Sequence, residues 1–149
     1  MKTFVSVMIF LALISISAYE LNTSKEVDNM KIPECELFSI HDLKIRDNVD
    51  MKEFENYVMN EIAPLYKQMK GQQLFLIKGY NGYRKGQYSI LLTFDSIEDR
   101  DRIYPLSGGF SEEFKKIMEG KETMWDKFYS MADGFDGKAP HTDYVRVGH

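Results

Sequence analysis

The stretch QQLFLIKGYNGYRKGQYSILLTFDS, residues 72–96, decides the fold. It contains two apolar runs of strand length, Leu74–Tyr80 and Gln87–Phe94, and between them Asn81-Gly82, a pair that tolerates positive φ and is typical of hairpin turns. In the middle of each run, apolar residues follow one another without a polar break. Strands that are apolar on both faces are covered on both faces. We therefore expect a central β-hairpin with helices on one face and a further protein layer on the other.

The composition bounds the class of protein. The chain has 149 residues, which suits a single domain, and its 44% hydrophobic and 13% aromatic residues suffice for a sizeable core. A net charge of −4 argues against a nucleic-acid partner. Because Cys35 is the only cysteine, no intrachain disulfide can form, and its sequence neighbourhood predicts an inert thiol.

The first 18 residues predict export. Lys2 supplies a basic start, Phe4–Ile16 is an apolar stretch of signal-peptide length, and the small residues Ser17 and Ala18 suit a cleavage site. The apolar stretch is short for a membrane span. We therefore predict a signal peptide over residues 1–18, cleaved near Ser17/Ala18, and a secreted or periplasmic location. An N-terminal anchor or a buried helix is the alternative.

Residues 19–35 are polar and poorly periodic, which predicts a flexible lead-in. Asn22 opens the triplet Asn-Thr-Ser, a glycosylation sequon that has meaning only in a eukaryotic host. The remaining chain, residues 36–149, is expected to form one domain.

The first half of that domain predicts a strand and a helix. Glu36–Arg46 alternates between two faces and is expected to be a single strand. Asp50 begins a helix, with a carboxylate three residues later as in a capping box. The helix is expected to kink at Pro64 and to end at Gly71.

After the hairpin, the pattern predicts a broken helical region and a last strand. Ser96 caps a short helix, and a loop with two glycines follows Tyr104-Pro105. Ser111 begins a long second helix in which Gly120 is a weak point. Thr142–Val147 is expected to be the final strand.

The order β-α-β-β-α-β is the split βαβ plan of ferredoxin-like folds, an α+β class with a four-stranded antiparallel sheet. The junction Tyr88–Ser96, the loop Tyr104–Phe110 and the closing Thr142–Val145 resemble those of the dimeric α/β-barrel superfamily. That superfamily includes antibiotic-biosynthesis monooxygenase-like, EthD-like and stress-responsive barrel proteins. The resemblance covers about residues 37–147. It implies that two such sheets pack face to face across a twofold axis and close a barrel.

The resemblance implies what covers the second face of the hairpin. In a homodimer, we expect Phe38 and Ile40 of the first strand, with Phe75 and Ile77 of the second, to be buried against the partner sheet. The alternative is a monomer with this face open, which would expose a larger apolar patch than monomers usually tolerate.

Superfamily members that bind small molecules do so between the sheet and the helices. The resemblance implies that His41 and Tyr88 face this space from neighbouring strands, where they could converge as a general acid/base pair. The structural alternative is a histidine satisfied by a neighbouring hydroxyl and a tyrosine that only packs. The loop Pro105–Phe110, with its glycines, is the natural lid. The pocket candidates are Ser39, His41, Tyr88, Ile90, Tyr104, Ser107, Phe110 and Trp125.

No cofactor is predicted. The spacings H-x-H and E-x-x-H of metal sites are absent, and the expected long helices carry no histidine that could hold haem. The loop after the short helix also lacks the histidine that polyketide-cyclase-like members carry there.

Three functions remain open. The first is an exported barrel that binds a small apolar or aromatic ligand. The second is a cofactor-independent monooxygenase or isomerase acting on an aromatic or polyketide-like compound, and the third is a structural or interaction dimer without a pocket. In none of them do we expect a nucleic-acid partner, or a membrane in the mature form.

Overall fold

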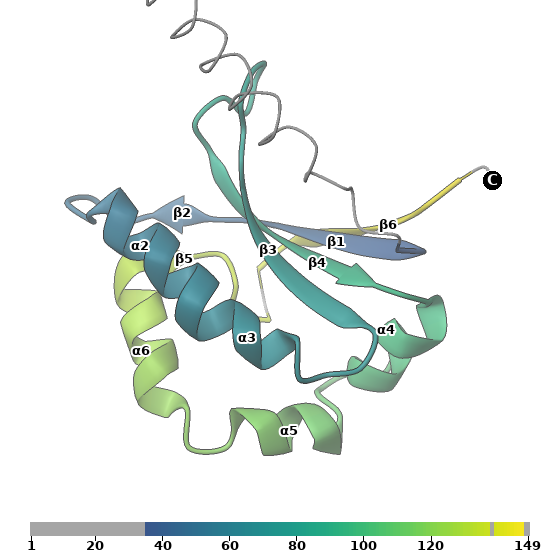
Figure 1. Ribbon diagram of the computed structural model, residues 1–149. Helices are drawn as coiled ribbons and strands as arrows, with labels where there is room; N and C mark the ends of the chain where they lie inside the picture. Colours follow the sequence, from purple (N-terminus) through teal and green to yellow (C-terminus); the bar gives the residue numbers. More distant parts are fainter. Residues whose placement is uncertain (1–34, 138, 148–149) are drawn as a thin grey trace, which may run out of the picture. The chain divides into compact units, whose positions relative to one another are not determined.

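The computed structural model describes residues 35–137 and 139–147 (Figure 1). The predicted signal peptide, its cleavage site and the sequon at Asn22 lie outside these residues. The described part is an α+β domain with one four-stranded antiparallel sheet. Its elements, in chain order, are β1 (Leu37–Asp42), β2 (Lys44–Ile45), α2 (Met51–Tyr57), the π-helical η1 (Val58–Ile62), α3 (Ala63–Tyr66), β3 (Gln72–Lys78), β4 (Tyr88–Phe94), α4 (Ile97–Ile103), α5 (Glu112–Met118), α6 (Glu122–Met131), β5 (Ala132–Asp133) and β6 (His141–Val145).

The four-stranded sheet has the order β3-β4-β1-β6, and every neighbouring pair is antiparallel. This arrangement is consistent with the ferredoxin-like plan. The predicted hairpin is present as β3 and β4, in the register Leu74↔Leu92. Gly82 and Gly86 in its turn both have positive φ, which glycine adopts without steric cost.

The first strand differs from the prediction of one continuous strand over Glu36–Arg46. It breaks at Leu43, and the following β2 pairs with β5 in a separate two-stranded sheet. Gly134, directly after β5, passes so close to the carbonyl oxygen of Asp42 that a side chain there would overlap it. The strand therefore divides where a distant glycine crosses it, which the local alternation could not show.

The first helix begins as predicted, because the Asp50 side chain accepts a hydrogen bond from the Glu53 amide at 2.9 Å. Instead of a simple kink at Pro64, the helix widens over η1, where the Ala63 amide reaches back five residues to the Val58 carbonyl. A proline cannot donate to the carbonyl four residues earlier and its ring crowds it, so a wide turn just before Pro64 relieves both problems. Gly71, with a φ of 76°, follows the helical region.

The predicted long second helix is two helices, α5 and α6. They are separated at Gly120, whose φ of 70° is incompatible with continuing a right-handed helix. The predicted caps are present on the shorter pieces. Ser96 accepts from the Asp99 amide at the start of α4, and Ser111 accepts from the Phe114 amide at the start of α5, both at 3.1 Å.

The sheet has two unlike faces. The described helices lie on one side of the strands (Figure 1), and on that side alternate residues of β1 and β4 are buried. The core there is formed by Leu37, Phe54, Val58, Ile62, Leu74, Ile90, Leu92, Phe94 and Phe128. On the opposite side, Phe38, Ile40 and Phe75 are half-buried and Ile77 is exposed. The predicted division of these residues between the two faces is therefore correct.

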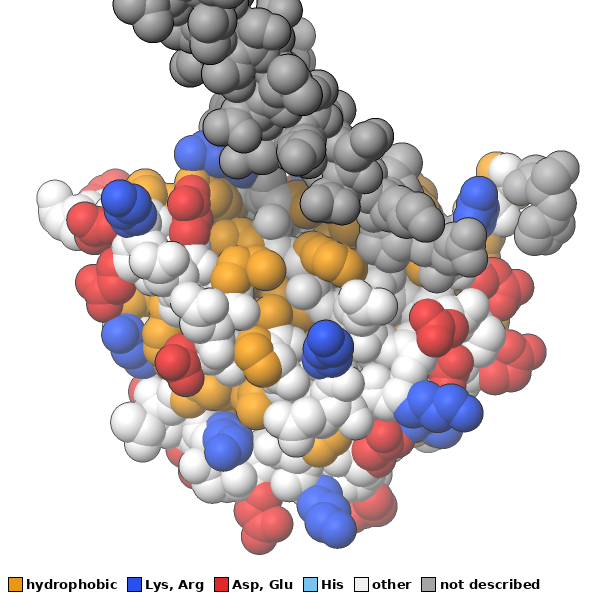
Figure 2. All heavy atoms as spheres, in the orientation of Figure 1, with side chains coloured by type: hydrophobic (Ala, Val, Ile, Leu, Met, Phe, Trp, Pro, Cys, Tyr) orange, Lys and Arg blue, Asp and Glu red, His pale blue; other side chains and the backbone are white. Residues whose placement is uncertain are grey.

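One face of the molecule has a mixed charge. On the face drawn in Figure 2, Lys and Arg side chains are interspersed with Asp and Glu side chains. Among the described residues, no helix has the length and apolar character needed to cross a lipid bilayer.

Candidate functional site

A cavity of about 1100 Å³ lies between the sheet and the α4–α6 region. Its apolar walls are mainly aromatic, and the rings are contributed by Tyr66, Phe94, Tyr104, Phe110, Phe114, Trp125, Tyr129 and Phe135. Phe110 and Phe114 stack at 4.3 Å between centroids, and Trp125 stacks on Tyr129 at 6.0 Å. Both α5, through Phe114, and α6, through Trp125 and Tyr129, contribute rings to this lining.

The sheet side of the cavity carries a polar patch. Ser39 and His41 of β1 lie opposite Asp143 and His141 of the neighbouring β6. The Ser39 hydroxyl and His41 Nε2 are 3.1 Å apart, and the rings of His41 and His141 stack at 4.6 Å. Phe135 meets His41 edge-on at 4.9 Å. Two buried side chains of β1 and two exposed side chains of β6 thus form one small polar patch beside the aromatic walls of the cavity.

The patch holds His41 in its neutral form. Burial, and to a smaller extent the neighbouring His141, lower the pKa of His41 from 6.5 to about 4, against an opposing effect of Asp143. At neutral pH the imidazole therefore has one nitrogen able to donate and one able to accept a hydrogen bond.

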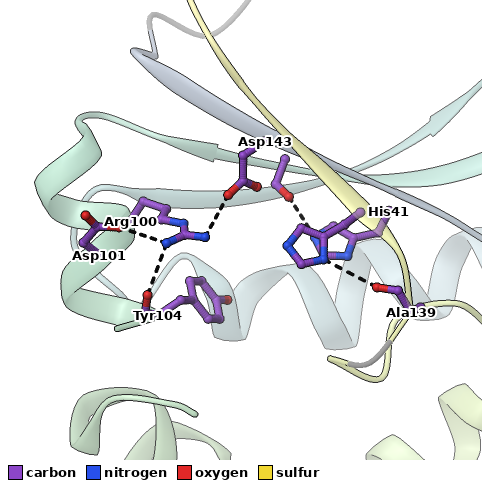
Figure 3. Close-up of polar contacts among 8 residues, drawn as sticks. His41, Arg100, Asp101, Tyr104, Ala139 and Asp143 are labelled. Carbon is purple, nitrogen blue, oxygen red and sulfur yellow. Dashed lines mark hydrogen bonds and ion pairs between the residues drawn. The ribbon is translucent and has the colours of Figure 1, made fainter. Parts of the chain in front are cut away.

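Arg100 connects the patch to α4. Its guanidinium contacts the Asp143 carboxylate at 2.8 Å and the Asp101 carboxylate at 2.9 Å, and it reaches the Tyr104 carbonyl at 3.4 Å (Figure 3). The negative charge of Asp143 is thereby compensated. Arg100 is also held in place, so it is not a free cation for a ligand.

Tyr104 provides a second buried polar group. Its hydroxyl accepts a hydrogen bond from Gln72 Nε2 at 2.9 Å. Burial raises the pKa of Tyr104 well above its usual value, so the phenol stays protonated.

Five of the eight predicted pocket residues line this cavity: Ser39, His41, Tyr104, Phe110 and Trp125. The other three lie elsewhere. Tyr88 donates to Glu55 of α2, and the Lys78 ammonium lies 4.7 Å above its ring. Ile90 is completely buried, and Ser107 is exposed on the loop. His41 and Tyr88 thus have different partners, and the structure does not bring them together.

Sequence reasoning missed His141, Asp143 and Arg100. His141 and Asp143 could have been predicted, because the final strand lies next to the first in the expected sheet and alternate residues of a strand share one face. Arg100 had no such indication, since its contact with Asp143 spans 43 residues.

The described residues give no metal centre: none of their His, Cys, Asp and Glu side chains form a group of three or more that could hold an ion. Burial raises the pKa of the Cys35 thiol, which keeps it in the less reactive protonated form.

Comparisons of the chain with protein-family models, with curated proteins and with solved structures find no significant match. The cavity is therefore the feature of the chain that bears on its function.

Proposed function

We propose that the protein binds a small apolar or aromatic molecule in this cavity, as an exported dimeric α/β-barrel protein. The observation that carries the proposal is a cavity of about 1100 Å³, open to solvent on one side, with aromatic walls and a polar patch on the sheet. Small-molecule sites are typically cavities of this scale, mostly apolar, with a few polar groups that fix orientation. A structural dimer has no need of such a space, so the cavity favours a binding protein over that alternative.

The chain contains its own reporter for binding. Trp125 is its only tryptophan and lines the cavity. Titration with a panel of small aromatic compounds should change the fluorescence of Trp125, and native mass spectrometry should detect a molecule that co-purifies. If neither method detects binding, the proposal is wrong.

The same geometry supports a second function, a cofactor-independent monooxygenase or isomerase. The supporting observation is the neutral His41 beside the Ser39 hydroxyl inside the cavity, because a neutral imidazole can accept a proton from a bound substrate. Turnover of a quinol under air, without added metal or flavin, would separate this enzyme from a pure binding protein.

His41→Ala separates a functional from a structural histidine. If His41 serves the site, ligand retention or turnover falls. If it is structural, only stability falls, by about 1 kcal/mol for one lost hydrogen bond. A thermal melt and a retention assay on the same variant decide between the two, with Ser107→Ala on the exposed loop outside the cavity lining as the control.

We also propose a homodimer through the sheet face opposite the helices. Support comes from its apolar side chains, since Phe38 stacks on Tyr144 at 5.2 Å and Phe75, Ile40 and Ile77 lie on the same face. A charge at Ile77 would be desolvated in such an interface, so Ile77→Asp should give a monomer. Light scattering of the unmodified protein tests the dimer directly, and a monomer at micromolar concentration would contradict it.

Export remains a proposal supported by the basic start and apolar stretch of residues 1–18. N-terminal sequencing of protein from its native host should find a chain beginning near Tyr19. Intact Met1 on the bulk of the protein would contradict export with cleavage.

A further inference from the structure

Three of the described tyrosines line the cavity, and their hydroxyl groups differ in their contacts. The Tyr129 hydroxyl donates to the Phe135 carbonyl at 3.2 Å. The Tyr104 hydroxyl accepts from Gln72 Nε2 at 2.9 Å. The Tyr66 hydroxyl hydrogen-bonds to none of the described residues. Buried polar groups in folded proteins are paired in the great majority of cases, so Tyr66 is an exception that a ligand would explain.

Tyr66 is buried at the wall of the cavity. It belongs to α3, and its side chain is only 3% exposed. Its ring centroid lies 5.9 Å from that of Phe135 and 6.3 Å from that of Phe114, and both of these rings line the same cavity. The Oε1 atom of Gln72 is also buried without a partner among the described residues, but Gln72 is not part of the lining. Tyr66 therefore places an unpaired hydroxyl where a bound molecule can reach it.

The unpaired hydroxyl offers a hydrogen. Burial raises the pKa of Tyr66 well above its usual value, and the neighbouring Tyr104 and Tyr129 act in the same direction, so the phenol is protonated at neutral pH. A phenolic hydroxyl can donate or accept a hydrogen bond. It donates better than it accepts, because its oxygen lone pair is delocalised into the ring. The complementary group on a ligand is therefore an acceptor.

The surroundings of Tyr66 favour an acceptor without charge. The rings of Phe114 and Phe135 that pack against it provide no hydrogen-bond donors. A carboxylate placed there would lose hydration that one phenol cannot replace. A carbonyl oxygen carries no full charge and needs fewer donors. The aromatic walls suit an aromatic group attached to that carbonyl, since rings pack favourably on rings in offset or edge-on arrangements.

We propose that the cavity takes an uncharged aromatic carbonyl compound, a ketone or an ester, whose carbonyl oxygen accepts a hydrogen bond from the Tyr66 hydroxyl. The aromatic part of the molecule packs against Phe114 and Phe135. This inference rests on the proposed function, because it assigns the ligand class to the same cavity.

The test uses two probes of one shape. 2-Acetonaphthone and 2-isopropenylnaphthalene differ only in that a CH₂ group in the second replaces the carbonyl oxygen of the first. Equilibrium dialysis measures the affinity of each probe for the unmodified protein and for Tyr66→Phe, which removes only the hydroxyl. We expect Tyr66→Phe to weaken binding of 2-acetonaphthone about tenfold, the scale of one hydrogen bond between neutral groups. Binding of 2-isopropenylnaphthalene should be unchanged.

Two further measurements separate ligand binding from a structural role of the hydroxyl. Because the hydroxyl has no partner among the described residues, Tyr66→Phe should not lower the melting temperature. The infrared carbonyl stretch of bound 2-acetonaphthone should lie at a lower frequency in the unmodified protein than in the variant, since a hydrogen bond weakens the C=O bond. Tyr57→Phe is the matched control, because the Tyr57 hydroxyl donates to the Met124 carbonyl at 2.8 Å and Tyr57 is not part of the cavity lining. This control should leave the ratio of the two affinities unchanged.

An equal change in both affinities, or no change in either, on Tyr66→Phe substitution would overturn the inference. The same carbonyl frequency in the two proteins, or a melting temperature lowered by loss of the hydroxyl, would overturn it too. None of these results requires that the probes fail to bind, so the proposed function would stand. Failure of both probes to bind would overturn the inference and count against the proposed function as well.

Discussion

The two halves of the domain follow the same strand–helix plan, but their helices differ in continuity and in burial. In the first half, α2, η1 and α3 form one continuous helical segment, and Phe54, Val58 and Ile62 are completely buried. In the second half, the helix is divided into α4, α5 and α6, and Leu106 and Phe110 of the connecting loop remain 82% and 43% exposed. The continuous segment packs into the core, whereas the divided region both joins the core through Phe128 and contributes most of the rings that line the cavity. The difference lies in two interruptions: α4 ends at Ile103, just before Tyr104-Pro105, and Gly120, with a φ of 70°, separates α5 from α6.

The largest expected effect tests the core of the first half. Phe54→Ala removes a completely buried ring that packs against Tyr88 and Phe128, so it should lower the free energy of unfolding by about 3–5 kcal/mol. Urea denaturation measures the loss. A loss below about 1 kcal/mol would show that the first half is not the tightly packed one.

The next effect concerns the cavity and the dependence of stability on pH. Because the folded state holds the pKa of His41 at about 4, against 6.5 when unfolded, the unfolded chain binds more protons in acid. The titration of His41 therefore leaves the free energy of unfolding unchanged above pH 6.5. It lowers that free energy as the pH falls from 6.5 through 4, by at most about 3 kcal/mol. The comparison is with His41→Gln, which lacks the titrating group. Parallel stability curves for the two proteins between pH 7 and 4 would contradict the prediction.

A smaller effect compares the helix caps of the two halves. Asp50→Ala removes the cap of the continuous helix and should reduce global stability by about 1 kcal/mol. Ser111→Ala removes the equivalent cap from the short α5, so we expect faster amide exchange in α5 with a smaller change in global unfolding. An equal decrease in the free energy of global unfolding in both variants would contradict this distinction between the halves.

The smallest effect on stability is expected at the cavity mouth. Phe110→Ala truncates a ring that is already 43% exposed, so the free energy of unfolding should change by less than about 1 kcal/mol. The ring stacks on Phe114 in the cavity wall, so release of a bound probe should become faster. A large loss of stability with unchanged release would mean that Phe110 is a core residue and not part of a lid.

These contrasts also explain what the sequence could predict. The hairpin, the burial pattern of β1 and the caps at Asp50, Ser96 and Ser111 depend on residues close in sequence, and all are present. The division of β1 from β2 depends on the passage of Gly134, about ninety residues away, and no local pattern records it. The break at Gly120 was visible as a weak point, but its cost had to be weighed against tertiary packing.

The candidate site was predictable to a similar degree. Alternation placed Ser39 and His41 on the cavity side, and the position of the loop suggested Phe110. Tyr88 was misplaced because alternation specifies a face but not a position along it, and at its end of β4 that face lies beneath α2 and Glu55. Arg100 required knowledge of how α4 lies against β6.

The π-turn of η1 has a consequence for the length of the chain. A wide turn of this kind accommodates one more residue than a regular helical turn while the segments on either side keep their buried faces. Met59 and Asn60 within it are both exposed, so deleting one of them removes no core contact. Pro64, two residues after η1, makes the regular alternative costly. If Pro64 is replaced by alanine, a chain shorter by one residue should close into an ordinary α-helix with Phe54 and Leu65 still inside. This helix is therefore a place where the protein can change length without changing its interior.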